Sequence, residues 1–531
     1  MTTDAVTLTP SVDADATRAI RAWLVPVLVG AAVFMAASLV VDSYVVGVVH
    51  DDGMYVVLAK ALASGRGYRW LHLPGAPPAT HFPPGYPAVL ALLWKLFPSF
   101  PENVAAFEFA NVLFLSAAAI GAFYFARLRF GMSELGSAIL ALATTLGIPT
   151  LALTVLVMSE PLFLALLVPT LLYAERIVSG ESPRTRDIVV LALLVGAATL
   201  VRTHGIALIG AITIVLALRR RWRDAALFAG IAGATLVPWQ LWVATHAGVV
   251  PSTMSGNYES YGAWFAGGLR AEGVDLIGRT LLRTTSDLGG MFETLLAPSM
   301  PTAVRITGLT VLCSLGILGA RTLWRRTPVS AGFLALYSAI ILVWPFWPAR
   351  FFWGVWPLVM MLPILGMRDV LAWRPSSRPA LAARTAALTA GALLAVGYLS
   401  YNARGYRHRW WGSIPRSISG EVRPMLNWIA SHAPRNALLA TEAETSVYLY
   451  TGRAAVPVTT FTVDEYFRPR SPVENAAVID TILTRYRPTA VIVSSGNMRD
   501  AVRELAFHQP PRLVAVDTFP LGGLVLVPRL R

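Results

Sequence analysis

The sequence predicts a polytopic α-helical membrane protein that carries a small soluble α/β domain after its last span. Hydrophobic residues make up 55% of the 531 residues and charged residues only 14%, against roughly 25% charged in an ordinary soluble domain. A single soluble core stops growing at roughly 250–300 residues, so lipid has to cover much of this apolar sequence. The apolar residues also form long uninterrupted blocks up to residue 401, and after that the blocks shrink to strand length.

The first apolar block, residues 22–41, is interpreted as a retained membrane span. The polar residues 1–17 before it are expected to form a disordered cytoplasmic tail, and Arg18 and Arg21 stand at its start. A cleavable signal peptide has an apolar core of about 7–15 residues, whereas this block is about as long as a bilayer is thick.

Ten further blocks are long enough to span a bilayer, which predicts about 11 transmembrane helices in total. With the N-terminus inside, the arginines gather in alternate loops, as expected for loops that face the cytoplasm. The apolar segment 86–97 has only about 12 residues, short of the roughly 20 of a span, so we interpret it as a re-entrant or juxtamembrane helix. The ten blocks are 104–126, 134–151, 159–177, 187–201, 205–219, 225–245, 302–321, 331–346, 350–371 and 383–401.

This topology divides the chain into a membrane module, residues 18–401, and an extracytoplasmic domain, residues 402–531. The loops 43–103 and 246–301 are expected on the same outer side. In the final domain, strand-length apolar blocks alternate with helical patterns, which is typical of a small α/β fold. Strands are expected at 437–441, 490–494, 513–517 and 524–527, and helices at 442–451, 472–486 and 498–507.

The net charge of +14 comes almost entirely from arginine, with Lys60 and Lys95 as the only lysines. Most of the arginines that flank the spans lie on predicted inner loops, so they indicate topology and no nucleic-acid partner. The single cysteine, Cys313, excludes an internal disulfide and a cysteine-based zinc site. No phosphate-binding loop, dinucleotide fingerprint, nucleophile elbow or zinc-protease motif is present.

The candidate catalytic residues are two adjacent carboxylates, Asp51 and Asp52, just outside the first span. A short amphipathic helix that includes Tyr55 follows them, and glycines and prolines then turn the chain back towards the membrane near Tyr86. A carboxylate at the lipid boundary can deprotonate an acceptor hydroxyl or hold a divalent cation, Mg or Mn. The alternative is that both residues only solvate the end of a span.

Other ionisable residues lie at predicted outer ends of spans, on the same side as the two carboxylates. They are Glu160, Arg202, His204 and Arg350. Because few arginines are expected on this side, Arg202 and Arg350 are candidates for binding a phosphate. The alternative for each is a snorkelling arginine that anchors a helix end.

Several short motifs, taken in order, resemble those of bacterial membrane glycosyltransferases of the GT-C superfamily. The group they resemble is similar to protein O-mannosyltransferases and to the lipid A aminoarabinose transferase, in glycosyltransferase family 39. The motifs are Asp51-Asp-Gly-Met-Tyr55, Gly65-Arg-Gly-Tyr68, Pro83-Pro-Gly-Tyr-Pro87, Met158-Ser-Glu-Pro161 and Tyr450-Thr-Gly-Arg453.

The resemblance implies a GT-C fold and an inverting transferase in the cytoplasmic (inner) membrane. The donor would be a polyprenyl phosphate-linked monosaccharide, and the acceptor a lipid, glycan or protein of the cell envelope. Asp51 would be the catalytic residue, and Asp52 stands where the family usually has glutamate. The donor phosphate would contact Arg66, His81, Arg202 or Arg350, the substrate site would include Tyr55, Tyr86, Glu160 and His204, and a cation would bind Asp51 and Glu160.

Two other functions are compatible with the sequence. One is a transporter or flippase of lipid-linked sugars, and the other is a polymerase or ligase that uses diphosphate-linked donors. Transporters usually place ionisable residues near the membrane midplane, in broken helices or paired repeats. Here these residues cluster at the ends of spans, so a transferase is favoured, with no catalytic role assigned to the C-terminal domain.

Overall fold

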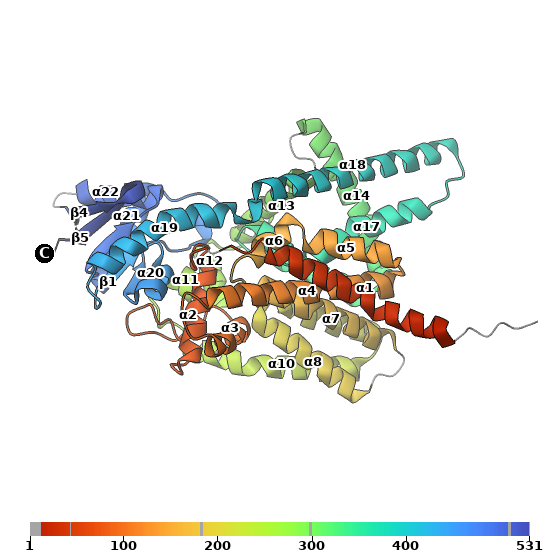
Figure 1. Ribbon diagram of the computed structural model, residues 1–531, viewed down its shortest axis with the longest axis horizontal. Helices are drawn as coiled ribbons and strands as arrows, with labels where there is room; N and C mark the ends of the chain where they lie inside the picture. Colours follow the sequence, from red (N-terminus) through yellow and green to blue (C-terminus); the bar gives the residue numbers. More distant parts are fainter. Residues whose placement is uncertain (1–11, 43, 181–183, 297–299, 508–510, 530–531) are drawn as a thin grey trace, which may run out of the picture.

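The computed structural model describes residues 12–42, 44–180, 184–296, 300–507 and 511–529. A bundle of long helices makes up most of it, and a small domain with a sheet lies at one end of the bundle (Figure 1). We call this end of the bundle the domain end.

The helices of the bundle coincide with the eleven predicted spans. Two predicted spans each contain a pair of shorter helices. The bundle consists of α1 (Val12–Ser38), α4 (Val104–Phe130), α5 (Glu134–Thr145), α6 (Ile148–Thr154), α7 (Glu160–Ser179), α8 (Thr185–Val201), α9 (Ile206–Leu218), α10 (Trp222–Thr245), α14 (Thr302–Arg326), α15 (Pro328–Leu342), α16 (Pro348–Trp353), α17 (Trp356–Ala372) and α18 (Arg378–His408).

Five of the described helices are long and apolar enough to cross a membrane, namely α4, α7, α10, α14 and α18. The pair α5 and α6, bent by 57°, makes a sixth if it is counted as one span. The remaining helices of the bundle are shorter or less apolar, so the predicted count of about 11 spans is not confirmed. Helix α1 begins at Val12, within the expected disordered tail, and residues 1–11 lie outside the described residues.

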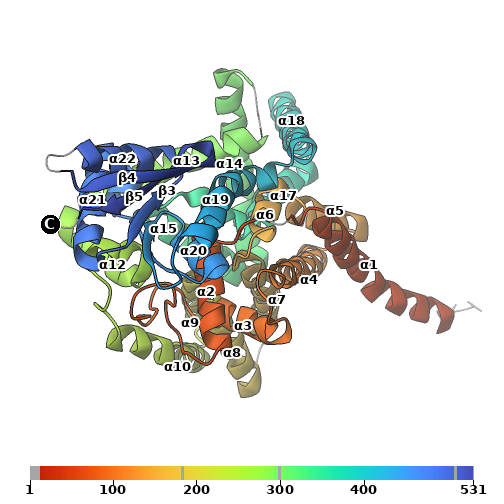
Figure 2. The ribbon, with the colours of Figure 1, turned by 60° about the vertical axis from the view of Figure 1, so that its left-hand side comes forward.

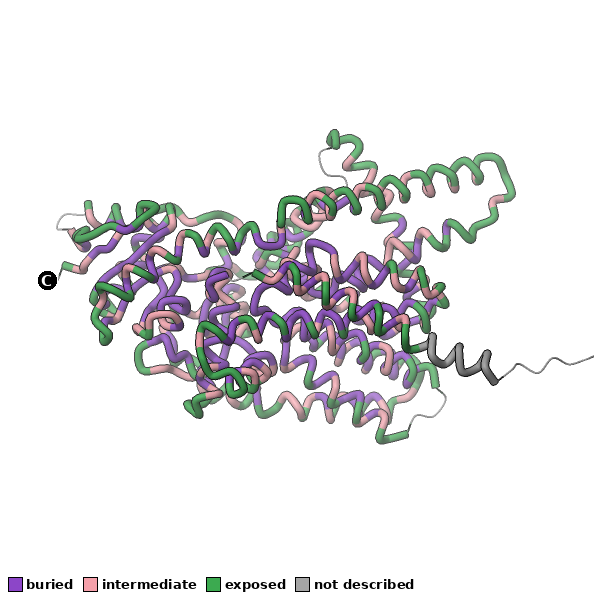
Figure 3. The backbone as a smooth tube through the Cα atoms, viewed as in Figure 1, coloured by how far each residue is buried: buried purple, intermediate pink, exposed green. Residues whose placement is uncertain are grey.

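The long helices differ in how much of their surface is buried inside the protein. In the most apolar stretch of α4, 67% of the residues are buried inside the protein, but in that of α18 only 6% are. Figure 3 shows the same contrast, with α14 and α18 largely exposed along their length. Helices α4 and α7 therefore form the core of the bundle, whereas the apolar faces of α14 and α18 are suited to contact with lipid.

The two long loops at the domain end, residues 43–103 and 246–301, also form helices. The first, residues 43–103, contains α2 (Asp51–Ala63) and α3 (Gly85–Leu96). With 12 residues, α3 is too short to span a bilayer, and it packs against α2 and α8. The second loop contains α11 (Ser255–Tyr258), α12 (Tyr261–Glu272) and α13 (Asp275–Leu296).

The C-terminal domain begins with α19 (Ser413–His432) and has a five-stranded sheet in the order β2-β1-β3-β5-β4. The strand β1 pairs in parallel with β2 and β3, and β5 pairs antiparallel with β3 and β4. All four predicted strands are present, and β2 is an additional strand. The elements are β1 (Leu438–Thr441), α20 (Glu444–Thr451), β2 (Ala454–Pro457), α21 (Pro472–Tyr486), β3 (Ala490–Val493), α22 (Gly496–Phe507), β4 (Leu513–Phe519) and β5 (Gly523–Pro528).

Candidate active site

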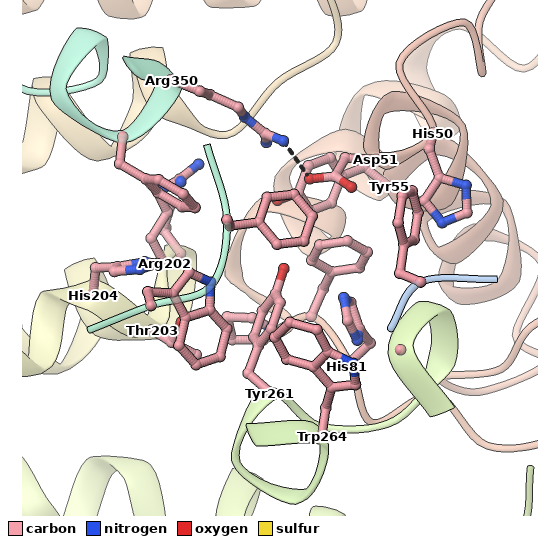
Figure 4. Close-up of a pocket in the computed structure, with 18 residues that line it drawn as sticks. His50, Asp51, Tyr55, His81, Arg202, Thr203, His204, Tyr261, Trp264 and Arg350 are labelled. Carbon is pink, nitrogen blue, oxygen red and sulfur yellow. Dashed lines mark ion pairs between the residues drawn. The ribbon is translucent and has the colours of Figure 1, made fainter. Parts of the chain in front are cut away.

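A pocket lies at the domain end, where side chains from several elements converge (Figure 4). Residues of the first loop, the helix ends, the second loop and the C-terminal domain line it. The titratable side chains include His50, Asp51, His81, Arg202, His204 and Arg350, and the aromatic ones include Tyr55, Tyr261, Trp264, Trp344 and Phe461.

A chain of ion pairs joins four residues that are far apart in the sequence. Arg350 binds Asp51 through Nη1, at 2.8 Å from Oδ2 (Figure 4), and binds Glu160 through Nε, at 2.8 Å from Oε1. Arg202 Nη1 lies 2.7 Å from the same Glu160 oxygen. Two guanidinium groups therefore share one buried carboxylate, and one of them also holds Asp51, whose side chain is 19% exposed.

The positions of these charges follow from helix geometry. Glu160 is the first residue of α7, where the positive end of the helix dipole stabilises a carboxylate. Arg202 directly follows α8, at the negative end of that helix, where a cation is favoured. Arg350 lies on the short helix α16. The structure thus brings together the outer helix ends that the sequence placed on one side.

Two further residues support this cluster. Ser159 lies within the motif Met158-Ser-Glu-Pro161 but was assigned no role from the sequence, and Asn111 was not singled out. Ser159 Oγ accepts a hydrogen bond from Arg202 at 3.0 Å and lies 3.1 Å from the hydroxyl of Tyr55. Asn111 is buried within α4, donates to the carbonyls of residues 156 and 158, and accepts a bond from Tyr86 Oη at 3.1 Å. An amide inside an apolar span is the signal that could have identified Asn111.

The adjacent carboxylates Asp51 and Asp52 have different surroundings. Asp51 lines the pocket, whereas Asp52 is buried and accepts the N–H groups of Gly47 and Val49, at 2.8 and 3.1 Å. Burial raises the pKa of Asp52. The carboxylate of Asp52 is therefore directed at the backbone that leads into α2, and only Asp51 is placed to meet a substrate.

The other predicted site residues lie at varying depths. His81 lines the pocket, where its ring packs 4.2 Å from that of Tyr261 and burial lowers its pKa to about 4. His204 lines the same pocket beside Phe351. Tyr86 is fully buried behind Tyr55.

Arg66 lies apart from this group. It is exposed just after the end of α2, and a helix of 13 residues separates it from Asp51 by roughly 20 Å. The structure therefore brings Arg350 to the carboxylate of Asp51 and Arg202 into the same pocket, but neither holds for Arg66.

Four lining residues come from regions without a motif, so sequence reasoning did not select them. His50 directly precedes Asp51, Tyr261 and Trp264 belong to the second loop, and Phe461 belongs to the C-terminal domain. Only the tertiary fold brings Phe461 next to His50, with ring centroids 5.6 Å apart. The C-terminal domain thus forms part of the pocket wall.

The donor set does not fit a resident metal ion. Among the described residues, no group of three or more His, Cys, Asp or Glu side chains could hold one. The two candidate ligands, Asp51 and Glu160, both bind the guanidinium of Arg350. We assign no step to a cation, and a divalent cation stays a prediction from the sequence.

The fold and the pocket together define a class, that of polytopic helical membrane proteins with a charged pocket beneath a C-terminal α/β domain. Two crystal structures of ArnT from Cupriavidus metallidurans share this fold. The one bound to undecaprenyl phosphate has a TM-score of 0.52 and 15% sequence identity, over 94% of this chain and 97% of ArnT. The apo form also has a TM-score of 0.52, with 13% identity, over 96% of this chain and 98% of ArnT.

The resemblance to the aminoarabinose transferase group is therefore confirmed at the level of the fold. No protein-family model matches the sequence, and no curated protein sequence matches it significantly.

Proposed function

We propose that the protein is an inverting glycosyltransferase that moves a monosaccharide from a polyprenyl phosphate to a cell-envelope acceptor. The reaction would take place at the outer face of the cytoplasmic membrane. The observation that carries the proposal is the pocket that Asp51 lines together with two arginines, the half-buried Arg350, which pairs with Asp51, and the buried Arg202. The crystal structure of ArnT with undecaprenyl phosphate supports a carrier of this chemistry, because the two proteins share a fold.

In this reaction Asp51 acts as the general base. Its carboxylate takes the proton of the acceptor hydroxyl while the hydroxyl oxygen attacks the anomeric carbon of the sugar. The bond between that carbon and the phosphate oxygen breaks, and the polyprenyl phosphate leaves with the bonding electrons. Attack from the face opposite the phosphate inverts the anomeric configuration. A positioned base of this kind contributes roughly 10²–10⁴-fold to the rate.

The two arginines stabilise the charge that develops on the leaving phosphate. Guanidinium groups match the geometry of phosphate oxygens, and donors fixed in advance need no reorganisation during the reaction. Glu160 holds both guanidinium groups in place through one oxygen. The lipid tail of the donor stays in the bilayer and so keeps the reacting carbon near the pocket, which lowers the entropic cost of the encounter.

The test replaces Asp51 with asparagine and measures sugar transfer in membranes that contain normal amounts of the protein. We expect transfer to be lost, whereas Asp500→Asn, a matched change at an exposed site of α22, should leave it unchanged. Undiminished transfer by Asp51→Asn would remove Asp51 from the mechanism.

A comparison of lipid-linked sugars in cells with and without the protein identifies the donor. Accumulation of one polyprenyl phosphate sugar in the absence of the protein is the expected result. Accumulation of a diphosphate-linked glycan would favour a polymerase or ligase. Movement of a lipid-linked sugar across vesicles, without a new glycosidic bond, would favour a transporter.

A further inference from the structure

The backbone that leads into Asp51 is held in a strained turn. His50 has φ 66° and ψ −63°, and the N–H of Asp51 donates to the carbonyl of Val49 at 2.8 Å. This is a γ-turn with a positive central φ, a conformation that is rare for any residue with a side chain. Strained backbone of this kind persists only where the surrounding structure enforces it. We call residues 45–50 the Asp51 loop.

Hydrogen bonds from the C-terminal domain hold the Asp51 loop. The N–H of Val45 donates to Ser419 Oγ of α19 at 3.0 Å, and the N–H of Val46 donates to Tyr450 Oη of α20 at 3.1 Å. Ser446 Oγ of α20 donates to the carbonyl of Val46 at 2.8 Å. Figure 2 shows α20 beside α2, the helix that begins at Asp51.

Two glycines allow α20 to approach this closely. Gly47 has φ +103°, and a Cβ there would overlap Ser446 Oγ. A Cβ at Gly53, in the first turn of α2, would overlap the hydroxyl of Thr445. The loop and the start of α2 therefore rest directly on the first turn of α20.

Glu444, the first residue of α20, is the point where three regions meet. It is buried, accepts a hydrogen bond from Tyr258 Oη of the second loop at 2.7 Å, and lies 3.8 Å from His50 Nδ1. Tyr258 in turn lies 3.0 Å from Nε2 of His72, in the first loop. The side chain at the centre of the strained turn thus lies against a carboxylate of the C-terminal domain.

We propose that α20 positions the general base of the transfer site, with Glu444 as a positioning residue that acts through His50 on Asp51. This inference rests on the proposed function, in which Asp51 is the base. Because His50 and Asp51 are consecutive, relaxation of the turn at His50 changes the direction in which Asp51 enters the pocket. The arginines lie on other elements, α16 and the end of α8, and both pair with Glu160 of α7, so α20 reaches them only through the ion pair between Asp51 and Arg350.

The experiment compares Glu444→Gln and Ser446→Ala in the full-length protein, reconstituted in lipid nanodiscs. Glutamine keeps the size of Glu444 and an acceptor for Tyr258 but loses the charge that faces His50. Glu504→Gln, at an exposed position of α22, is the matched control. Three quantities are measured: amide hydrogen exchange of residues 45–51, affinity for undecaprenyl phosphate, and the turnover number of sugar transfer.

We expect exchange of the Asp51 loop to accelerate and the turnover number to fall by roughly ten- to a hundredfold, because small displacements of a reacting group have effects of this size. Affinity for undecaprenyl phosphate should stay within about twofold of wild type, because the arginines bind the phosphate. A merely structural role for α20 would lower both affinity and turnover.

Two outcomes would overturn the inference. In the first, both variants keep the wild-type turnover number, even if hydrogen exchange of the Asp51 loop accelerates. In the second, the affinity for undecaprenyl phosphate falls together with the turnover number. Asp51→Asn separates this inference from the proposed function. If Asp51→Asn keeps full transfer, the proposed function fails. This holds even if the α20 variants show faster hydrogen exchange of the Asp51 loop. If Asp51→Asn abolishes transfer and the α20 variants do not slow it, only the inference about α20 fails.

Discussion

The two halves of the pocket are built in different ways. The cationic half consists of Glu160, Arg202 and Arg350, which lie on or next to bundle helices and form ion pairs of 2.7–2.8 Å. The base half consists of Asp51 on a strained turn, held by hydrogen bonds such as that between Val46 and Ser446, 400 residues apart. Packing of bundle helices against one another therefore fixes the cations, whereas contacts with the C-terminal domain fix the base.

From this difference we expect the cationic half to determine donor binding and the base half to determine turnover. Arg350 is the one described residue that forms ion pairs with both halves, through Asp51 and Glu160. Changes at Arg350 should therefore affect both donor binding and turnover, whereas changes confined to one half should affect mainly one of the two.

Among changes outside Asp51, the largest expected effect is that of Arg350→Ala. It removes a donor to the developing phosphate charge, and loss of one such donor typically lowers the rate by about 10²–10³-fold. It also leaves Asp51 without its ion-pair partner, so we expect weaker binding of undecaprenyl phosphate and a lower melting temperature. Transfer assays, lipid binding and thermal unfolding check this, with Arg503→Ala on the exposed face of α22 as control. Wild-type transfer by Arg350→Ala would contradict the proposed role of Arg350 in both donor binding and turnover.

The variant Glu160→Gln should change donor binding and turnover in opposite directions. The loss of the buried carboxylate leaves two guanidinium groups with one fewer negative charge between them, so undecaprenyl phosphate should bind several-fold more tightly. Turnover should fall by about tenfold, because the arginines lose their common anchor. Titration with undecaprenyl phosphate and steady-state transfer assays measure the two effects. A decrease in affinity would mean that Glu160 does not compete with phosphate for the arginines.

Treatment with EDTA tests whether the positive charge in the site comes from arginine or from a bound metal ion. Because Arg350 lies between Asp51 and Glu160, we expect EDTA to leave transfer within about twofold of its untreated rate. The assay uses washed membranes, with Mg²⁺ or Mn²⁺ added back to one sample. Loss of transfer with EDTA and its recovery with either ion would confirm the cation that the sequence predicts.

The smallest effect concerns the pH dependence of stability. Burial lowers the pKa of His81 from 6.5 to about 4, so the unfolded chain takes up a proton on this histidine at a higher pH than the folded protein does. The contribution of His81 to the free energy of unfolding is therefore complete above pH 6.5, and it decreases as the pH falls towards 4. The melting temperature of His81→Gln should decrease less over this range than that of the wild type. Parallel curves for the two proteins would contradict the assignment.

Much of the fold could be predicted, because long apolar blocks and strand-length blocks are local signals. Strand β2 was not predicted, since Ala454–Pro457 is only four residues long and ends in proline. Segment 86–97 was expected to be a short helix, and α3 ends at Leu96. The number of spans could not be settled, because several helices are shorter than a bilayer is thick and depend on their neighbours.

In the site, the cationic half was more predictable than the base half. Arg202 and Arg350 stood out because they are arginines on the side where few are expected. The separate surroundings of Asp51 and Asp52 could not be predicted, since they depend on the turn at His50 and on α20. Phe461 has no sequence signal at all, because its place in the pocket results only from packing of the C-terminal domain against the bundle.

The dependence of the Asp51 loop on α20 has a consequence for biosynthesis. Asp51 leaves the ribosome well before its partners Ser446 and Tyr450 and the pocket residue Phe461, which follow some 400 residues later. A nascent chain can insert its helices and bind lipid before these residues exist. The site is therefore assembled only after α20 and Phe461 have been synthesised, and chains that terminate before α20 carry the arginines without the contacts that position the base.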